Sequence, residues 1–362
     1  MKVGIDGRYA EGNLVGIGKY IKNLCEGLSQ RGVECFLFHS YQPKIEIKGK
    51  RIRKVLLNTR NRYYFEQVLL PKVLKEKKIS VYHAAGNTGI PIFTSTPSVL
   101  TVHDIIPLDF KGYFNFSRFP RLSETSYLFR LASSCMKAKK IIAVSDFTKK
   151  RVIKTLGVDE DKIKVIYSGV KTGKISSKNK ISLPEYFVLN HGGIDVRKNL
   201  EGLIRAFKLV RNRFPELKIV ITGENPNLRP KLENLAQKLK ISDSVIFTGY
   251  VREDVLWSLI RNAVCICYPS LMEGYGAPVL EGFAAGIPVI TSNVGSLPEV
   301  AGDAAILINP RDPNEIAKAI GEVLSNRKKT REMIIKGKKR AKEFTWEKTI
   351  EETINLYREV VG

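Results

Sequence analysis

Two carboxylates, Glu273 and Glu281, lie on either side of a glycine-rich segment that also contains Pro278. The apolar residues 263–268 before them predict a buried strand, and the residues up to Gly286 predict a helix that begins near Pro278. A strand that turns into a helix N-terminus offers backbone N–H groups and the positive end of a helix dipole, which suit a phosphate. The flanking carboxylates suit hydroxyl groups of ribose or hexose. The segment therefore predicts a ligand with both features, such as a sugar nucleotide.

A pair of cations follows a second glycine turn. Arg197 and Lys198 come after Gly192 and Gly193, at what the sequence predicts to be the start of a helix. Acidic residues are the usual preference at a helix N-terminus, so two cations there indicate a function. They can stabilise a diphosphate as it leaves. The alternative is a solvated helix start with ordinary surface cations.

These two motifs belong to an ordered set that resembles family 4 glycosyltransferases, which are retaining enzymes of the GT-B fold. The matching segments are residues 3–6 with 16–20, then 101–107, 142–148, 165–170, 192–199, the Glu-x7-Glu pair and 344–347. Together they cover nearly the whole chain. The resemblance implies an α/β protein with two Rossmann-like, doubly wound parallel-sheet domains that face a central cleft.

The resemblance also implies roles for particular residues. Glu281 would bind the ribose hydroxyls and Glu273 the hydroxyls of the donor sugar. His103 would contact the donor sugar near the reacting centre, and Asp104 would orient it or its loop. The implied catalytic set is His103, Asp104, Glu273, Lys198 and Arg197. The implied donor-binding set is Gly16, Gly18, Gly192, Gly193, Arg197, Lys198, Tyr250, Val251, Glu273, Gly274, Tyr275, Gly276 and Glu281.

One position departs from the family pattern. Many members carry Gly-Arg where this chain has Gly192-Gly193, followed by a lysine in the place of Lys198. That departure leaves Arg197 as the candidate to replace the missing arginine.

The implied reaction moves a hexose from a nucleotide diphosphate sugar to a hydroxyl of a saccharide or of a lipid-linked acceptor. The sequences of residues 101–108 and 192–200 look most like those of bacterial or archaeal mannosyltransferases and rhamnosyltransferases of surface-polysaccharide assembly. GDP-mannose is therefore the favoured donor and a UDP-hexose the second. Retention would follow from front-face attack, with a donor phosphate oxygen taking the acceptor proton. We expect no cofactor and no metal ion, because no Asp-x-Asp motif has a suitable context.

Three other functions compete with this interpretation. A glycoside hydrolase would use Glu273 and Glu281 as acid and base, which leaves Arg197 and Lys198 without a role. A GT-B nucleotide-sugar epimerase would share the fold but lacks the Gly-Tyr-Gly-Ala-Pro context. A basic nucleic-acid-binding protein is suggested by the pI of 9.7, but the sequence shows no nucleic-acid motif, so no nucleic-acid partner is expected.

The length of 362 residues predicts two domains of ordinary size. We expect an acceptor-binding domain over 1–170, a nucleotide-sugar-binding domain over 171–345, and a last helix over 346–362 that packs back on the first domain. Residues 168–184 are rich in Lys, Ser and Gly and predict a linker. Strands are predicted at 2–5, 33–38, 79–83, 98–102, 140–144, 164–166, 186–190, 218–222, 244–247, 264–268 and 289–291. Helices are predicted at 18–30, 64–77, 146–156 and 346–361.

The formal net charge of +24 calls for an explanation. Nucleic acid, an anionic membrane surface and a lysine-rich proteome would each account for it. Basic residues and aromatics alternate over 44–65 and 110–130, which is typical either of an interfacial segment or of a solvated face over core aromatics. We expect a monomer or homodimer in the cytoplasm, because no apolar run is long enough to span a membrane, with peripheral contact to an anionic membrane as one option. The five cysteines lack metal-type spacing and predict reduced, buried thiols.

Overall fold

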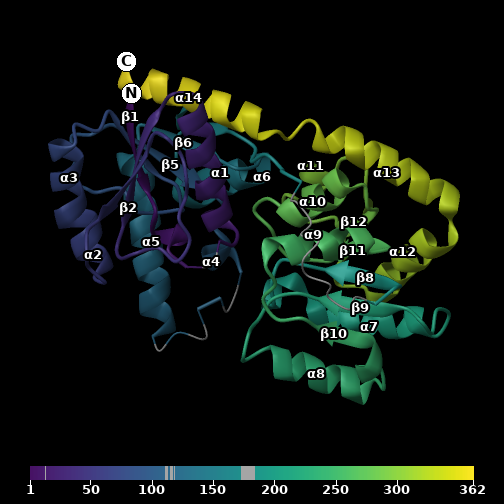
Figure 1. The fold of residues 1–362 in the computed structure, drawn as a ribbon. Coiled ribbons are helices and arrows are strands. Elements are labelled where there is room, and N and C mark those ends of the chain that lie inside the picture. Colours follow the sequence, from purple (N-terminus) through teal and green to yellow (C-terminus); the bar gives the residue numbers. More distant parts are fainter. Residues whose placement is uncertain (13, 111–112, 115–116, 118, 173–183) are drawn as a thin grey trace. The chain divides into compact units, whose positions relative to one another are not determined.

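The computed structural model describes residues 1–12, 14–110, 113–114, 117, 119–172 and 184–362. It divides into two compact units (Figure 1). Unit 1 contains Met1–Gly169 and Trp346–Gly362, and unit 2 contains Val170–Thr345. Residues 173–183 of the predicted linker lie outside the described residues, as do Lys111, Phe116 and Arg118 of the second basic and aromatic segment.

Unit 1 is built on a parallel sheet of seven strands in the order β3-β2-β1-β4-β5-β6-β7. The strands are β1 (Lys2–Asp6), β2 (Glu34–His39), β3 (Ile52–Leu56), β4 (Val81–Ala84), β5 (Ser98–Val102), β6 (Lys140–Ala143) and β7 (Ile163–Val165). The chain runs outward from β1 to β3, returns to β4 and then runs outward to β7. The order therefore reverses between β1 and β4, which is the position where open α/β sheets bind ligands.

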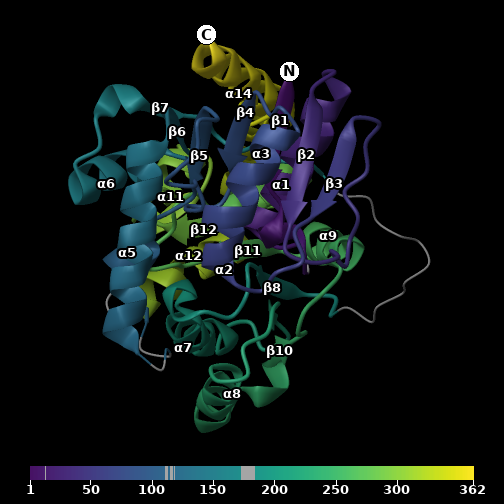
Figure 2. The ribbon, with the colours of Figure 1, turned by 90° about the vertical axis from the view of Figure 1, so that its left-hand side faces the viewer.

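Helices cover both faces of this sheet. On one face α1 (Ile17–Gln30) packs with α14 (Trp346–Val361), and Ile21, Leu24, Ile350 and Tyr357 share a core there. The other face carries α2 (Arg62–Tyr64), the π-helix η2 (Phe65–Leu69), α3 (Leu70–Glu76), α5 (Pro120–Lys137) and α6 (Asp146–Leu156), as Figure 2 shows. Short elements η1 (Arg8–Ala10), α4 (Ile106–Asp109) and η3 (Glu160–Lys162) lie in the connections.

Unit 2 repeats the plan with a parallel sheet of six strands in the order β10-β9-β8-β11-β12-β13. The strands are β8 (Phe187–Asn190), β9 (Lys218–Ile221), β10 (Val245–Phe247), β11 (Cys265–Tyr268), β12 (Val289–Ser292) and β13 (Ile306–Ile308). Here the order reverses between β8 and β11. The helices are η4 (Val196–Lys198), α7 (Leu200–Arg211), α8 (Arg229–Lys238), η5 (Ser242–Ser244), α9 (Glu253–Asn262), α10 (Ala277–Ala285), α11 (Leu297–Ala301), α12 (Pro313–Ser325) and α13 (Arg327–Ala341).

The predicted fold class, two doubly wound parallel-sheet domains, is confirmed for each unit. Residues 98–102, 146–156 and 346–361 form the predicted elements with the predicted bounds. Two edge strands, β3 and β13, were not predicted. The basic residues of the first basic and aromatic segment include Arg53 and Lys54 of β3, so part of that segment is an edge strand. The five cysteines are buried and unbonded, as predicted. Within the described ranges, no helix is both long and apolar enough to cross a membrane.

Candidate active site

The predicted donor-binding residues of unit 2 gather where its strand order reverses. Gly192 and Gly193 follow β8, and Glu273 follows β11, which pairs with β8. Both glycines have positive φ, 122° and 92°, which side chains with a Cβ rarely adopt. A Cβ on Gly192 would lie 3.2 Å from the Tyr268 ring and 3.5 Å from Pro278. The turn at Gly192 and Gly193, the end of β11 and the start of α10 therefore meet closely.

A buried ion cluster lies at this point. Lys198 Nζ and Arg197 Nη1 each donate to a different oxygen of Glu273, both over 2.7 Å. The Tyr268 hydroxyl donates to Glu273 Oε1 over 2.7 Å and also accepts a hydrogen bond from Lys198. Lys198 and Glu273 are only 4% and 6% exposed. The structure thus brings together three predicted residues and adds Tyr268, which was predicted only as part of a strand.

The cluster is charged at neutral pH. Burial by itself would raise the pKa of the Glu273 carboxyl, but Lys198 and Arg197 outweigh it and hold that pKa at about 2. Burial lowers the pKa of the Lys198 ammonium, and the attraction of Glu273 opposes that effect. Two cations therefore face one buried carboxylate. Asp195 lies 3.5 Å from the Arg197 guanidinium and is half exposed, so its compensation is weaker.

Arg197 and Lys198 were predicted to stand at the start of a helix, but they lie in a 3₁₀ turn that precedes the α-helix. Val196–Lys198 form the 3₁₀ turn η4, and its N-cap is Asp195, whose Oδ1 accepts the Arg197 N–H over 3.0 Å. The α-helix α7 begins at Leu200, after Asn199 in the left-handed conformation with φ of 55°. That tight turn directs the Lys198 side chain into the protein toward β11.

A loop after β12 supports the turn that carries Glu273. The Ser296 hydroxyl lies 3.0 Å from the Glu273 carbonyl and 2.8 Å from the Tyr275 carbonyl, and the Ser296 N–H also donates to Glu273 O over 3.2 Å. A Cβ on Gly295, where φ is 66°, would come within 2.9 Å of the same Glu273 carbonyl. Neither Gly295 nor Ser296 was predicted, because both come from a strand end distant in sequence.

The turn leads into α10 through Gly276, whose φ is 103°. Pro278 lies in the first turn of α10, and Gly286 caps its C-terminus in the left-handed conformation, as predicted. Glu281 lies in the middle of α10, with Oε2 3.4 Å from Nδ1 of the buried His191. The carboxylate is thus placed beside the Gly192 turn.

Tyr250 and Val251 follow β10, and contacts between glycines connect their loop to the Gly193 turn. The Gly223 N–H donates to the Gly249 carbonyl over 2.8 Å. A Cβ on Gly223, where φ is 104°, would lie 2.5 Å from Gly193 Cα. Gly249, just before Tyr250, is therefore bonded to Gly223, and Gly223 packs against Gly193.

His103 belongs to unit 1 and follows β5. Its Nε2 lies 2.9 Å from the Ala85 carbonyl, which can only accept, so Nε2 carries the proton. The His103 N–H donates to Asn87 Oδ1 over 2.7 Å, and the Tyr20 ring meets the imidazole edge-on at 4.9 Å. Burial lowers the pKa of His103 to about 4, although the hydrogen bond to Ala85 opposes that effect. His103 is therefore neutral at pH 7, held in one tautomer.

The remaining predicted residues of unit 1 lie at the same edge of its sheet. Asp104 Oδ1 accepts the Ile106 N–H over 3.2 Å and so holds its own loop. Gly16 precedes α1 with φ of 46°, and a Cβ on Gly18 would lie 2.7 Å from the Tyr9 carbonyl. Gly18 is thus needed for close packing of the loop before α1.

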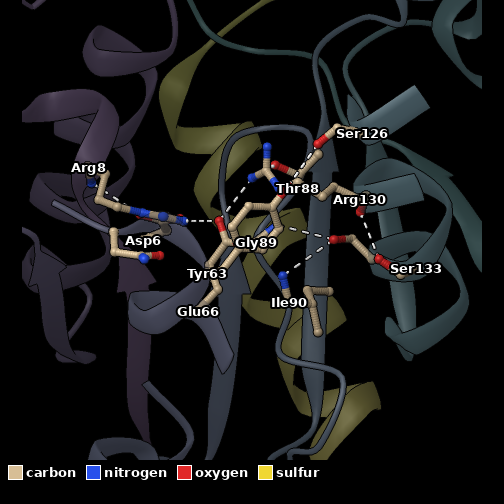
Figure 3. Close-up of polar contacts among 12 residues, drawn as sticks. Asp6, Arg8, Tyr63, Glu66, Thr88, Gly89, Ile90, Ser126, Arg130 and Ser133 are labelled. Carbon is tan, nitrogen blue, oxygen red and sulfur yellow. Dashed lines mark hydrogen bonds and ion pairs between the residues drawn. The ribbon is translucent and has the colours of Figure 1, made fainter. Parts of the chain in front are cut away.

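Unit 1 has a buried ion network of its own, which was not predicted (Figure 3). Arg8 bridges Asp6 and Glu66 with contacts of 2.6 Å and 2.7 Å, and Arg130 donates to Glu66 over 2.9 Å and to Thr88 over 2.7 Å. It joins β1, η2, the loop after β4 and α5. Thr88 of this network lies in the same loop as Ala85 and Asn87, which both form hydrogen bonds with His103. The network therefore supports the loop that holds His103.

In the described part of the chain, no group of three His, Cys, Asp or Glu side chains is arranged to hold a metal ion. Metal independence stays a prediction.

Comparison with known proteins agrees with the motifs. Residues 15–174 match the family model described as Glycosyltransferase Family 4, and residues 171–340 match the one described as Glycosyl transferases group 1. The chain is 30% identical over 298 residues to the O-antigen chain mannosyltransferase B of Escherichia coli, which covers 79% of this chain and 76% of that protein. It is also 30% identical over 267 residues to the serotype-specific mannosyltransferase WbdA of Escherichia coli, covering 70% of this chain and 32% of that protein.

Solved structures show the same fold at low sequence identity. A sucrose-phosphate synthase from Thermosynechococcus elongatus superposes with a TM-score of 0.81 at 19% identity, covering 99% of both chains. The Anabaena protein HepE, solved in complex with UDP and glucose, gives a TM-score of 0.79 at 17% identity, covering 99% of this chain and 100% of that one. These likenesses establish the GT-B fold. On its motifs, its two family models and its mannosyltransferase relatives, the chain belongs to the family 4 glycosyltransferases.

Proposed function

We propose that this glycosyltransferase moves a mannosyl group from GDP-mannose, with retention of configuration, to a hydroxyl of a saccharide or lipid-linked acceptor. The relatives that support a mannosyl donor are the O-antigen mannosyltransferase B, WbdA and the O-antigen mannosyltransferase RfbU of Salmonella typhimurium, which is 27% identical over 76% of this chain. The carrying observation is the buried cluster of Lys198, Arg197, Glu273 and Tyr268 where the strand order of unit 2 reverses.

In this proposal Lys198 and Arg197 stabilise the diphosphate that leaves. An ammonium has three N–H groups, and among the described residues Lys198 gives two of them to Tyr268 and Glu273. The third can face a phosphate oxygen. Glu273 keeps Lys198 in place and in its charged form, because removing that carboxylate would leave the ammonium to the full effect of burial. Such preorganised charge typically contributes a few kcal/mol to stabilising the transition state.

The two ends of the donor are assigned to different residues. Glu281 accepts hydrogen bonds from the ribose diol, and the N–H groups of Gly274, Tyr275 and Gly276 face the sugar and phosphate. The Glu273 oxygens accept hydrogen bonds from Lys198, Arg197 and Tyr268, so a contact with sugar hydroxyls would use the lone pairs that these three donors leave open. Backbone groups near Tyr250 and Val251 contact the base. His103, neutral and with Nε2 held by Ala85, offers Nδ1 as an acceptor for a sugar hydroxyl.

Retention is assigned to front-face attack, in which a donor phosphate oxygen takes the proton of the acceptor hydroxyl. Glu273 is not suited to be the general acid of a hydrolysis, because a carboxyl with a pKa of about 2 holds no proton at neutral pH. That property, with the family relationship, disfavours the glycoside hydrolase alternative. The same relationship favours a transferase over the epimerase and the nucleic-acid binder. No metal ion and no cofactor take part in this proposal.

A UDP-hexose donor is the second candidate. The observation that favours it is the fold likeness to HepE, whose structures contain UDP, glucose and UDP-glucose. The remaining proposals are a monomer or homodimer in the cytoplasm, with peripheral contact to an anionic membrane and no nucleic-acid partner.

The test is a transfer assay with GDP-mannose and UDP-glucose on a panel of saccharide and lipid-linked acceptors. The anomeric configuration of the product is read by proton NMR. We expect an α-mannosyl product from the α-linked donor. Transfer from UDP-glucose alone would select the second candidate, and a β-linked product would contradict retention.

A further inference from the structure

Helix α5 presents an apolar stripe on its exposed side. Leu122, Phe129 and Met136 recur every seventh residue, so they lie within about 20° of one line along the helix. The stripe runs for about 21 Å at a rise of about 1.5 Å per residue. The opposite side of α5 buries Leu131 and Cys135 against the sheet. The helix therefore has two apolar sides, and only one of them is used by the core.

Three further exposed hydrophobic side chains belong to segments bonded to α5. The Tyr63 hydroxyl lies 2.8 Å from the Ser126 hydroxyl, which ties α2 to α5 (Figure 3). The loop that carries Phe93 is held between η2 and α5, because its Ile92 N–H donates to Gln67 and its Gly89 N–H donates to Ser134. Val68 lies in η2 next to Gln67.

We name this surface the α5 face. The exposed fractions are 85% for Phe93, 79% for Met136, 68% for Leu122, 61% for Phe129, 54% for Tyr63 and 51% for Val68. Figure 2 shows the helices that carry it on one side of the sheet. Large hydrophobic side chains exposed on segments that are bonded to one another indicate an interaction site.

The charges around the α5 face are strongly one-sided. Within residues 60–78 and 119–139, the exposed acidic residues are Glu76 and Glu124, while Glu66 is buried in the ion network with Arg8 and Arg130. The exposed cations of these segments are Arg60, Arg62, Lys72, Lys75, Lys77, Lys78, Arg121, Lys137 and Lys139. A partner must therefore be apolar where it meets the stripe and anionic around it.

We infer that the α5 face lies on the surface of an anionic lipid bilayer, with the stripe among the headgroups and upper acyl chains. An interfacial helix combines an apolar face with flanking cations, and basic residues near an anionic leaflet are attracted to it. A second copy of the chain would place these cations against their own kind, which is repulsive. Nucleic acid would meet Leu122 and Met136, which neither stack on bases nor bind phosphate.

This inference deepens the membrane contact proposed above and centres it on the exposed side of α5, where Leu122 and Phe129 belong to the predicted segment 110–130 and Met136 lies beyond it. Two other aromatics of the segment 110–130 pack on each other, because the Tyr113 and Phe114 rings meet edge-on at 5.3 Å. The Phe114 ring also lies 6.1 Å from Tyr127 on α5.

The test is co-sedimentation of the full chain with vesicles of phosphatidylcholine alone or with about one third phosphatidylglycerol. We expect partition onto the anionic vesicles and at least a tenfold loss in Phe129→Ser/Met136→Ser. The Lys75→Glu/Lys137→Glu variant should lose several-fold. The matched controls lie in unit 2: Ile335→Ser for an exposed apolar residue, and Lys318→Glu/Lys328→Glu for exposed cations. Both controls should bind like the wild type.

Wild-type partition by Phe129→Ser/Met136→Ser would overturn the inference. So would a dimer in sedimentation velocity that the same variant makes monomeric, because the occupant would then be a second copy. Circular dichroism checks that the variants are folded. Transfer to a soluble acceptor without lipid should be unchanged in these variants, so loss of vesicle binding leaves the proposed function standing. Absence of transfer with intact vesicle binding would instead remove the proposed function.

Discussion

The ammonium nitrogen of Lys198 lies 2.7 Å from Glu273 Oε1, and both side chains are buried. The two residues follow different strands: Lys198 comes after β8 and its glycine turn, and Glu273 lies in the loop after β11. Their pairing ties together the two loops at the position where the sheet of unit 2 reverses. Each charge makes the burial of the other tolerable, so the pair is expected to act as one unit in stability and in catalysis.

A double-mutant cycle measures that coupling. Lys198→Met should destabilise unit 2 by about 3–5 kcal/mol, because it removes one partner of a buried ion pair. Glu273→Gln should also destabilise it, and the double variant should lose less than the sum by about 1–3 kcal/mol. Urea unfolding in a Trp346→Phe background reports unit 2, because Trp257 is then the remaining tryptophan. Simple additivity would mean that the two side chains are not coupled.

Tyr268→Phe tests the hydroxyl that the sequence did not reveal. The substitution keeps the ring but removes the donor to Glu273 and the acceptor for Lys198. We expect a loss of about 1–2 kcal/mol in the stability of unit 2, since buried groups lose hydrogen-bond partners, and a fall in the rate of transfer. Tyr186→Phe, in the same unit, is the control and should change stability by less than about 0.5 kcal/mol. Equal effects of the two substitutions would deny Tyr268 a special role.

The two units should differ in their sensitivity to acid. Burial lowers the pKa values of His39 and His103 to about 4, and burial with the nearby His103 lowers that of His83 to about 3. The unfolded chain, whose imidazoles titrate near 6.5, therefore binds protons that folded unit 1 does not bind. Unit 1 should lose stability as pH falls from about 6.5 toward 4, by up to about 1.4 kcal/mol per pH unit for each histidine.

Unit 2 has a lower pH window. The pKa of Glu273 is held at about 2 against an ordinary value of 4.5, so its contribution is present above about 4.5 and lost as pH falls toward 2. Trp257→Phe and Trp346→Phe variants isolate the unfolding of units 1 and 2, respectively. A pH-independent unit 1 between 6.5 and 4.5 would contradict the burial of its histidines, and Glu273→Gln should flatten the response of unit 2 below 4.5.

Close packing of the glycine loops predicts the effect of a single methyl group. Gly223→Ala should distort the Gly193 turn and weaken nucleotide binding at least tenfold, because its Cβ would lie 2.5 Å from Gly193 Cα and φ is 104°. Gly321→Ala is the control: it lies within α12, and apart from the adjacent backbone of that helix no described atom lies within 4 Å of the added Cβ. It should stabilise the protein by up to about 1 kcal/mol. Calorimetric titration measures nucleotide binding, and wild-type affinity in Gly223→Ala would contradict the close packing of these loops.

The sequence predicted most of the fold because hydrophobic periodicity and turn residues act locally. The helices at 146–156 and 346–361 have clear amphipathic patterns, and Ser145 is the N-cap of α6, with its hydroxyl accepting the Thr148 N–H. Strand β3 escaped prediction because Arg53 and Lys54 interrupt its apolar pattern, which an edge strand tolerates.

The candidate site was predicted in part for the same reason. Motifs located Lys198, Glu273 and Glu281, since each stands beside a glycine turn. They could not show that Lys198 points inward, because that depends on the left-handed Asn199 and on β11. They also missed Tyr268, hidden in an apolar run, and Ser296, which reaches Glu273 from the loop after another strand. Contacts between distant strand ends arise from topology, which local patterns do not encode.

The most direct test of the central claim is calorimetric titration of the full chain with GDP, UDP, ADP and TDP. The wild type should bind one of them, GDP being favoured, and Glu281→Gln should bind that nucleotide at least tenfold more weakly while Lys318→Ala, an exposed lysine of the same unit, binds it normally. Binding of none of the four nucleotides, or equal binding by Glu281→Gln, would contradict the assignment of the nucleotide to the edge of unit 2 formed by Gly192, Lys198 and α10.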